Sequence, residues 1–258
     1  MSNSVLSEKH GRVTLITMNR PEKKNAVNTP MWDALREAFE AADADTGCAA
    51  VVLTGAGGNF CAGVDLTSFG DSDGIEDASE HPFDRCARYI ANFPKPWIGA
   101  AQGVAIGGGA TVLFHADICY VGESLRMRLP FANLGLAPEF ASSYMLQANI
   151  GAQHAAELFY TAQWIDASLA VETGIAARSF SDEKLLQAAL DRAQDIAKWP
   201  VNALKEIKST LRLPHQAAID TAFIAESEGM ERLAGTPENI EAITAFMEKR
   251  DPDFSKLD

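Results

Sequence analysis

The stretch GVAIGGGATVLF at residues 103–114 places three consecutive glycines directly after an apolar run, and this arrangement decides how the chain can fold. A second glycine-rich stretch, GAGGNFCAGVDL at 55–66, follows the apolar run AAVVLTG at 49–55 in the same way. Because glycine has no side chain, backbone N–H groups there can face a ligand closely, and two of them converging on one oxygen form an oxyanion hole. The residues alone leave two alternatives open: tight packing of a helix on a strand, or a phosphate loop that lacks the Walker lysine.

The pattern around these glycines predicts an α/β fold, because strand-like and helix-like segments alternate up to about residue 130. Residues 4–19 are expected to form a hairpin with Gly11 near its turn, since the second half alternates apolar and polar side chains. Residues 28–45 predict a helix that Thr29 caps and that has Pro30 in its first turn. Buried strands are expected at residues 49–55, 96–103 and 116–122.

After Phe140 the pattern is helical and stays so. Apolar residues recur at helical spacing in the segments 185–200, 201–213, 217–233 and 238–250. We therefore expect a core over residues 1–200 and a C-terminal helical region over residues 201–258, which fits the size limit of single hydrophobic cores. Such a helical tail is expected to pack on its own core or on another subunit.

Composition and charge exclude several classes of protein. The net charge of −13 argues against a nucleic-acid partner, for which a basic surface supplies most of the binding. No apolar run reaches the roughly 20 residues of a membrane helix, so no membrane association is expected, and the first residues lack the layout of a signal peptide. The four cysteines form no CxxC pair and the histidines are scattered. We therefore expect a reduced, cytoplasmic protein without a metal site.

Five motifs occur in a fixed order along the chain: MNRPEKKNAVN (18–28), NFCAGVDLTSF (59–69), GVAIGGGATVLFHADICY (103–120), PFANLGLAPEFASSYML (130–146) and TAQWIDASLAVETGIA (161–176). Together they resemble the crotonase family, also called the enoyl-CoA hydratase/isomerase family, over nearly the whole chain. The resemblance implies a spiral of ββα units with a helical C-terminal region used for trimerisation, and a homotrimer or a hexamer of two trimers. It also implies an acyl-CoA thioester substrate and no separate cofactor, because coenzyme A is part of that substrate.

The resemblance implies an oxyanion hole built from two backbone N–H groups, those of Val64 and Gly108. Val64 follows the glycine of the AGxD stretch, and Gly108 is the middle glycine of the triple, at a helix start. Losing one such donor typically costs about 3 kcal/mol of barrier. Neighbouring residues are expected to contact the substrate as well, although Asp65 fits a structural carboxylate better than a base. These neighbours are Ala62, Gly63, Asp65, Leu66 and Gly107.

The departures from the family pattern point to Glu139. The hydratases of the family use two glutamates, and their positions are Thr111 and Phe131 here. The mitochondrial-type isomerases also place their base at the Phe131 position. The peroxisomal-type Δ3,Δ2-enoyl-CoA isomerases resemble GVDLTSF and PFANLGLAPEFASSY, and their single catalytic glutamate lies at the position of Glu139. The resemblance therefore implies an isomerase in which Glu139 takes a proton from C2 and returns it to C4, with its pKa raised by apolar surroundings.

Other candidates have weaker support. Lys23 and Lys24 follow the first strand pair, and the resemblance places them near coenzyme A, although a solvated basic turn explains them equally well. Phe131 is a candidate for the wall of the acyl pocket. His115 and Cys61 fit packed core residues. Three alternatives stay open: an enoyl-CoA hydratase with its second acid in the loop at 71–84, another family chemistry such as dehalogenation or thioester hydrolysis, and a non-catalytic acyl-CoA-binding protein.

Overall fold

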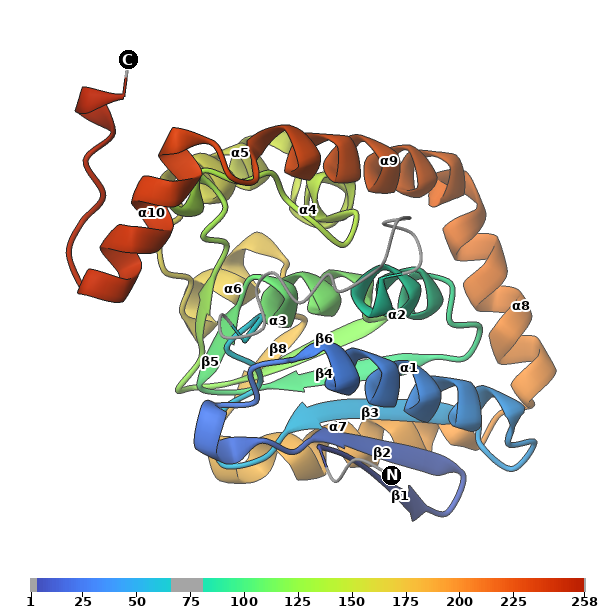
Figure 1. The fold of residues 1–258 in the computed structure, drawn as a ribbon. Coiled ribbons are helices and arrows are strands. Elements are labelled where there is room, and N and C mark those ends of the chain that lie inside the picture. Colours follow the sequence, from blue (N-terminus) through green and yellow to red (C-terminus); the bar gives the residue numbers. More distant parts are fainter. Residues whose placement is uncertain (1–3, 66–80, 258) are drawn as a thin grey trace.

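A six-stranded sheet forms the centre of the molecule (Figure 1). The computed structural model describes residues 4–65 and 81–257. The strand order is β1-β2-β3-β4-β6-β8, in which β1 and β2 are antiparallel and each other neighbouring pair is parallel. These strands are β1 (Val5–His10), β2 (Val13–Met18), β3 (Ala50–Gly55), β4 (Trp97–Ala101), β6 (Ile118–Gly122) and β8 (Arg178–Phe180). A parallel sheet of this kind is stable only when both of its faces are covered.

Alternate side chains of β2 and β3 enter two separate hydrophobic layers. Leu15 and Val52 belong to the layer formed with α7 (Asp182–Ala197). Ile16 and Leu53 belong to the larger layer, which contains the buried residues of α1 (Thr29–Ala44) and α2 (Pro82–Ala91). Figure 1 shows α7 on one side of the sheet and α1 and α2 on the other. Because successive side chains of a strand point to opposite faces, β2 and β3 contribute to both cores.

A second, smaller layer connects the sheet to the glycine triple. β5 (Val104–Ile106) and β7 (Arg126–Arg128) form a two-stranded parallel sheet. β5 leads directly into the short helix α3 (Gly108–Thr111), so the chain turns from strand to helix within the triple. The remaining elements of this part are η1 (Pro21–Lys23), η4 (Val112–His115), η5 (Ala132–Leu134), α4 (Ser142–Ile150), α5 (Ala152–Thr161) and α6 (Ala167–Thr173).

The C-terminal region packs on its own core. Its elements are α8 (Val201–Arg212), η6 (Leu213–His215), α9 (Gln216–Leu233), α10 (Pro237–Glu248) and η7 (Phe254–Lys256). Figure 1 shows α8 along one side of the molecule and α9 running across α4. Ile219 and Phe223 of α9 are buried in the larger hydrophobic layer. The helical tail therefore covers the loop between η5 and α4, where Glu139 lies.

Most expected elements are confirmed, and two expectations are wrong. The cap of α1 is Asn28, whose Oδ1 accepts a 3.2 Å hydrogen bond from the Met31 N–H, whereas Thr29 is already helical. Both residues are good caps, and only the backbone decides between them. The segment after Phe140 is not purely helical, because β8 adds an edge strand beside β6. Its three residues are exposed or half-buried and show no strand pattern.

Two expectations concern residues outside the described ranges. Leu66 is one of them, and residues 71–80 of the acidic loop are the other. The last part of that loop is described and begins α2 at Pro82. Among residues 4–65 and 81–257, no helix combines the length and the apolar character needed to cross a membrane.

Candidate active site

The two glycine segments lie against each other, backbone to backbone. The Cys61 N–H donates to the Val104 carbonyl at 2.9 Å, and the Ile106 N–H donates back to the Cys61 carbonyl at 3.0 Å. A Cβ on Gly63 would lie 2.7 Å from the Ile106 oxygen, and one on Gly109 would lie 2.5 Å from the Cys61 oxygen. Side chains are excluded at these two positions because the backbones approach too closely.

The backbone N–H groups of Val64 and Gly108 are both available to bind a ligand. The residues on either side of Val64 bond to Val27: the Val27 N–H donates to Gly63 at 2.8 Å, and the Asp65 N–H donates to Val27 at 2.9 Å. In such a parallel bridge the Val64 N–H faces away from Val27. Gly108 is the first residue of α3, where an N–H has no acceptor within the helix. Neither N–H makes a hydrogen bond to any residue that the structure describes.

The Glu139 carboxyl lies beside Gly108. A Cβ built on Gly108 would be 3.8 Å from Glu139 Oε2 and 3.3 Å from Cη2 of Trp32. The Thr111 hydroxyl donates a 2.7 Å hydrogen bond to Glu139 Oε1. Oε2 is shielded from solvent and has no hydrogen-bond partner among the described residues. The structure therefore leaves one carboxyl oxygen beside Gly108 without a partner among the described residues.

The environment of Glu139 raises its pKa to about 8. Burial is the main cause, because removing an ionised carboxylate from water costs free energy and so favours the protonated form. The negative charges of Glu226 and Asp84 raise the pKa further. The hydrogen bond from Thr111 opposes the shift. A carboxyl that titrates near neutral pH can both accept and release a proton during one reaction cycle.

Aromatic side chains cluster beside Gly108 and Phe140, on either side of this carboxyl's position in the chain. Phe83 contacts Trp32 edge to face, with 5.1 Å between ring centroids, and lies 5.8 Å from the ring of Phe140. Phe131, the candidate for the pocket wall, is 6% exposed and packs against Phe159 at 6.0 Å. Phe131 therefore belongs to the core beneath the site, and its contact with a substrate stays a prediction.

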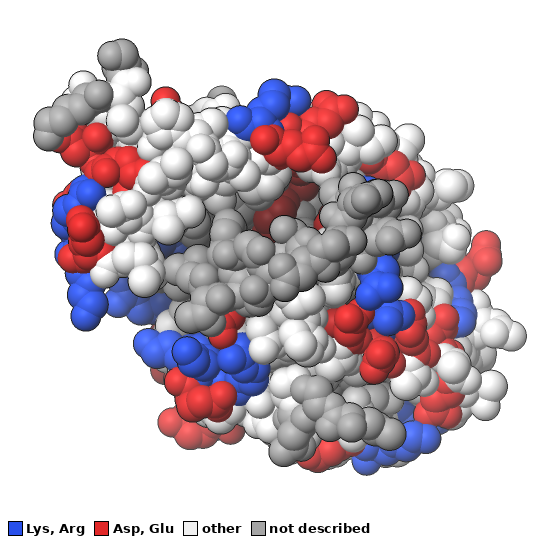
Figure 2. Space-filling model, viewed as in Figure 1, with Lys and Arg blue, Asp and Glu red and all other residues white. Residues whose placement is uncertain are grey.

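Most of the remaining predicted residues hold the glycine segments and the neighbouring turn in position. Asp65 is 7% exposed and pairs with Arg20 at 3.0 Å, which anchors the first glycine segment. The Ala62 N–H donates to the Lys24 carbonyl at 2.9 Å, so the lysine turn is attached to the same segment. The side chains of Lys23 and Lys24 are exposed. Figure 2 shows a group of Lys and Arg side chains at lower left, where η1 lies in Figure 1.

Gly107 and His115 complete the geometry around the triple. Gly107 has φ of +51° and donates its N–H to the Arg128 carbonyl at 3.1 Å, so its own amide faces away from Glu139. His115 is buried with a pKa lowered to about 3, mainly because burial disfavours the charged ring. Burial likewise raises the pKa of Cys61 to about 12, which fits a packed thiol and not a nucleophile.

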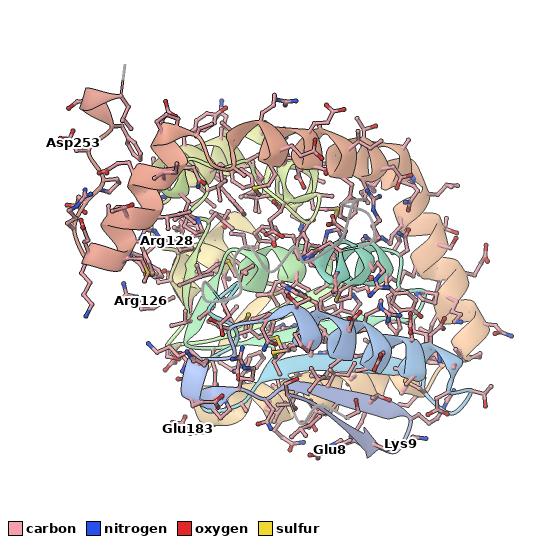
Figure 3. All side chains as sticks on the ribbon, viewed as in Figure 1. Glu8, Lys9, Arg126, Arg128, Glu183 and Asp253 are labelled. Atoms are coloured by element: carbon pink, nitrogen blue, oxygen red, sulfur yellow. The ribbon has the colours of Figure 1, made fainter. Side chains whose placement is uncertain are left out.

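One feature of the site escapes sequence reasoning. Thr111 was noted only as a missing acid, yet it is the hydrogen-bond partner of Glu139. Its place one helical turn after Gly108 was the available signal. Away from Glu139, Trp164 is 42% exposed and lies beneath Arg126 and Arg128, with guanidinium-to-ring distances of 4.5 and 5.2 Å. Figure 3 labels both arginines at the edge of the molecule near α10.

Comparisons with known proteins agree with the fold and the motifs. The model of a family described as enoyl-CoA hydratase/isomerase matches residues 8–256. The 2,3-dehydroadipyl-CoA hydratase of Escherichia coli is 32% identical over 98% of this chain and 99% of its own length. The 1,2-epoxyphenylacetyl-CoA isomerase of the same organism is 31% identical over 99% of both chains. Hydratase and isomerase names thus occur at the same level of identity.

The solved structures give the same result for the fold. The crystal structure of an enoyl-CoA hydratase/isomerase from Pseudoalteromonas atlantica superimposes with a TM-score of 0.91 at 33% identity. The match covers 98% of this chain and 100% of that one. The described elements therefore follow the architecture of a known family from end to end.

Proposed function

The chain belongs to the enoyl-CoA hydratase/isomerase (crotonase) family, and on that premise we propose that it shifts the double bond of an acyl-CoA thioester between C3 and C2. One observation carries the proposal. Oε2 of Glu139, which has no partner among the described residues, belongs to a carboxyl with a pKa of about 8 and lies beside Gly108 in the first turn of α3. A double-bond shift needs one such base, whereas water addition in the family pattern uses two acids.

The proposed mechanism uses two backbone donors and one carboxylate. The Val64 and Gly108 N–H groups bind the thioester oxygen and stabilise the negative charge that develops on it. Glu139 Oε2 removes a proton from C2 of a 3-enoyl thioester, and the electron pair of the broken C–H bond delocalises into a dienolate. The same oxygen then delivers the proton to C4, which yields the 2-enoyl thioester. Proton and charge balance without a second acid.

Hydration is the second candidate, because Asp84 lies close enough to raise the pKa of Glu139. Asp84 comes from the acidic loop at 71–84, the segment expected to supply a second acid. Burial raises its own pKa, while the nearby His81 and Arg88 oppose that shift. In a hydratase, Asp84 and Glu139 would share the activation of one water molecule.

Turnover of two substrates separates these candidates. Wild-type protein is supplied with a 3-enoyl-CoA and a 2-enoyl-CoA, and both isomerisation and water addition are measured. We expect fast isomerisation, little hydration, and an Asp84→Asn variant that keeps most of the isomerase rate. Robust hydration that disappears in Asp84→Asn would favour the second candidate over the first. Binding of acyl-CoA without turnover of either substrate would favour a binding protein.

Assembly and location belong to the same proposal. Large apolar side chains are exposed on the C-terminal elements, and such patches mark interfaces. They include Leu211 (68% exposed), Leu213 (74%), Ile224 (58%) and Met247 (69%). A trimer, or a hexamer of two trimers, would cover them, and sedimentation equilibrium should give three or six times the 27.7 kDa of one chain. The four free, buried cysteines support a cytoplasmic location.

A further inference from the structure

The turn that follows Glu139 has a backbone conformation that ordinary side chains avoid. Phe140 has φ of +64° and Ala141 has φ of +52°, two consecutive left-handed residues without a glycine. Ala141 is also the N-cap of α4, and its own side chain makes no capping hydrogen bond. Such a backbone persists only where surrounding groups hold it in place.

A carboxylate from the C-terminal region holds this turn. Glu226 of α9 accepts hydrogen bonds from the Ala141 N–H at 2.6 Å and from the Ser143 N–H at 2.7 Å. The two bonds use different oxygens, and the residue is only 6% exposed. Burial raises the pKa of Glu226, and these two hydrogen bonds oppose that shift because they favour the ionised form. Glu226 therefore caps α4 from another helix, 85 residues away along the chain.

The same face of α9 also contacts the loop ahead of Glu139. Gly229 follows Glu226 by one helical turn, so both residues lie on one side of the helix. A Cβ on Gly229 would be 2.9 Å from the Cβ of Ala137. Helix α9 therefore touches the backbone segment on both sides of Glu139, close to Ala137 and by hydrogen bonds at Ala141 and Ser143.

A histidine holds the turn from the opposite side. His115 Nε2 lies 2.6 Å from the Phe140 carbonyl oxygen, and its Nδ1 lies 3.3 Å from an Arg212 nitrogen. Arginine can only donate, so Nδ1 accepts and Nε2 carries the proton that is donated to Phe140. The left-handed turn is thus bonded at a carbonyl by η4 and at two amides by α9.

We propose that Glu226 is a positioning residue that acts through Glu139, by fixing the backbone of residues 140–143 from the C-terminal region. The inference rests on the proposed function, because positioning has a consequence only if Glu139 transfers a proton. It gives α9 an indirect part in the candidate active site of its own chain.

The charge of Glu226 adds an electrostatic effect to this contact. It raises the pKa of Glu139, as does Asp84 of α2, while burial contributes most. The other ionisable groups around the carboxyl are Cys61, whose thiol stays protonated, and neutral His115, with Arg212 behind it. Replacing Glu226 by a neutral residue should therefore lower the pKa of Glu139.

The test compares Glu226→Gln with Glu228→Gln, an exposed glutamate on the same helix that pairs with Arg232. Glutamine has one acceptor oxygen, so one of the two amides loses its partner. We expect kcat to fall about 10- to 100-fold with KM little changed, since small misplacements of a catalytic group have effects of this size. Titration of the Glu139 carboxyl by carbon-13 NMR, assigned with Glu139→Gln, should show a lower pKa. Glu228→Gln should match the wild type in both measurements.

An unchanged kcat, or a lower kcat without a shift in the Glu139 pKa, would overturn the proposal. If Glu226→Gln does not fold, Glu226→Asp is used in its place. Aspartate keeps the charge, but its shorter side chain moves the carboxylate away from the Ala141 and Ser143 amides. The kcat should therefore fall, while the pKa of Glu139 should change less than in Glu226→Gln. An unchanged kcat in Glu226→Asp would equally overturn it. In the wild type, fast hydrogen exchange of the Ala141 and Ser143 amides would do so without any variant.

The NMR titration separates this inference from the proposed function. A wild type without isomerase activity, in which Glu226→Gln still lowers the Glu139 pKa, would refute the function and keep the link between the two carboxylates. If the protein is an active isomerase and the pKa of Glu139 is the same in the wild type and in Glu226→Gln, the proposed function stands and the inference is refuted.

Discussion

The Thr111 hydroxyl donates a 2.7 Å hydrogen bond to Oε1 of Glu139, and this bond fixes which carboxyl oxygen is left to react. Oε2 then faces Gly108 without a partner among the described residues. Thr111 occupies a position where the resemblance places a glutamate in hydratases. In this chain the same position orients the Glu139 carboxyl and supplies no acid of its own.

Removing that hydroxyl should weaken catalysis in a pH-dependent way. Thr111 is fully buried, so Thr111→Val preserves the volume and deletes the donor. The hydrogen bond lowers the pKa of Glu139, so its loss should raise this pKa further and reduce the ionised fraction at pH 7. We expect kcat/KM at pH 7 to fall about 10-fold or more, with partial recovery above pH 9. Thr111→Ser keeps the hydroxyl and should stay near the wild type; equal losses in both variants would contradict the account.

The pH dependence of the wild type should report the ionisation of Glu139. The base works only in its ionised form, and its pKa is about 8. Below that value log kcat/KM should rise by one per pH unit, so the rate at pH 6 should be about one hundredth of the plateau. A plateau that already begins at pH 6 would show that another group, or an unperturbed carboxylate, is the base.

Neighbouring glycines of the triple should respond differently to alanine. A Cβ on Gly108 would lie 3.3 Å from Trp32 and 3.8 Å from Glu139 Oε2, a contact a side chain can relieve, so Gly108→Ala should fold and lose activity about 100-fold by crowding Glu139. A Cβ on Gly109 meets the Cys61 carbonyl at 2.5 Å, which forces the backbone apart. Gly109→Ala should lose about 1–3 kcal/mol of stability. Thermal melts and kcat/KM of both variants test this; an unstable Gly108→Ala would contradict it.

Burying the Glu139 carboxyl should make the protein less stable at high pH. The folded state binds the proton up to pH 8, whereas the unfolded chain releases it near 4.5, so stability falls as pH rises between these values. Glu139→Gln removes this dependence. At pH 9 the variant should melt several degrees above the wild type, since about 1 kcal/mol of stability corresponds to roughly 2–4 °C. Near pH 4 the variant and the wild type should melt at the same temperature. A difference in melting temperature that is constant with pH would contradict the explanation.

Local patterns predicted much of the fold. The hairpin at Val5–Met18 and the strand at Ala50–Gly55 follow from alternation and from apolar runs ending in glycine. The strand at Arg178–Phe180 could not be found, because three partly exposed residues form a strand only by pairing with β6. Asn28 and Thr29 are both residue types that cap helices, and which of them caps α1 depends on the residue at which the backbone becomes helical.

The site was predictable where a motif is local and hidden where it depends on distant contacts. The resemblance of their motifs to the family points to Glu139 and Gly108, and the structure places the two residues side by side, while their roles stay a prediction. The contact of Glu226 with Ala141 joins residues that are far apart in sequence, and nothing near Glu226 marks it as different from other helical glutamates. Such contacts arise only when α9 packs across α4.

The most direct test of the account is the isomerisation of 3-enoyl-CoA by Glu139→Gln. Glutamine keeps the shape of the side chain but cannot accept the C2 proton, and a general base contributes about 100- to 10,000-fold to a rate. Glu157→Gln, an exposed position on α5, is the matched control. We expect Glu139→Gln to lose about 1,000-fold in kcat and to bind acyl-CoA with unchanged affinity. Glu157→Gln should keep the kcat of the wild type. Isomerisation by Glu139→Gln within tenfold of the wild type would contradict the account.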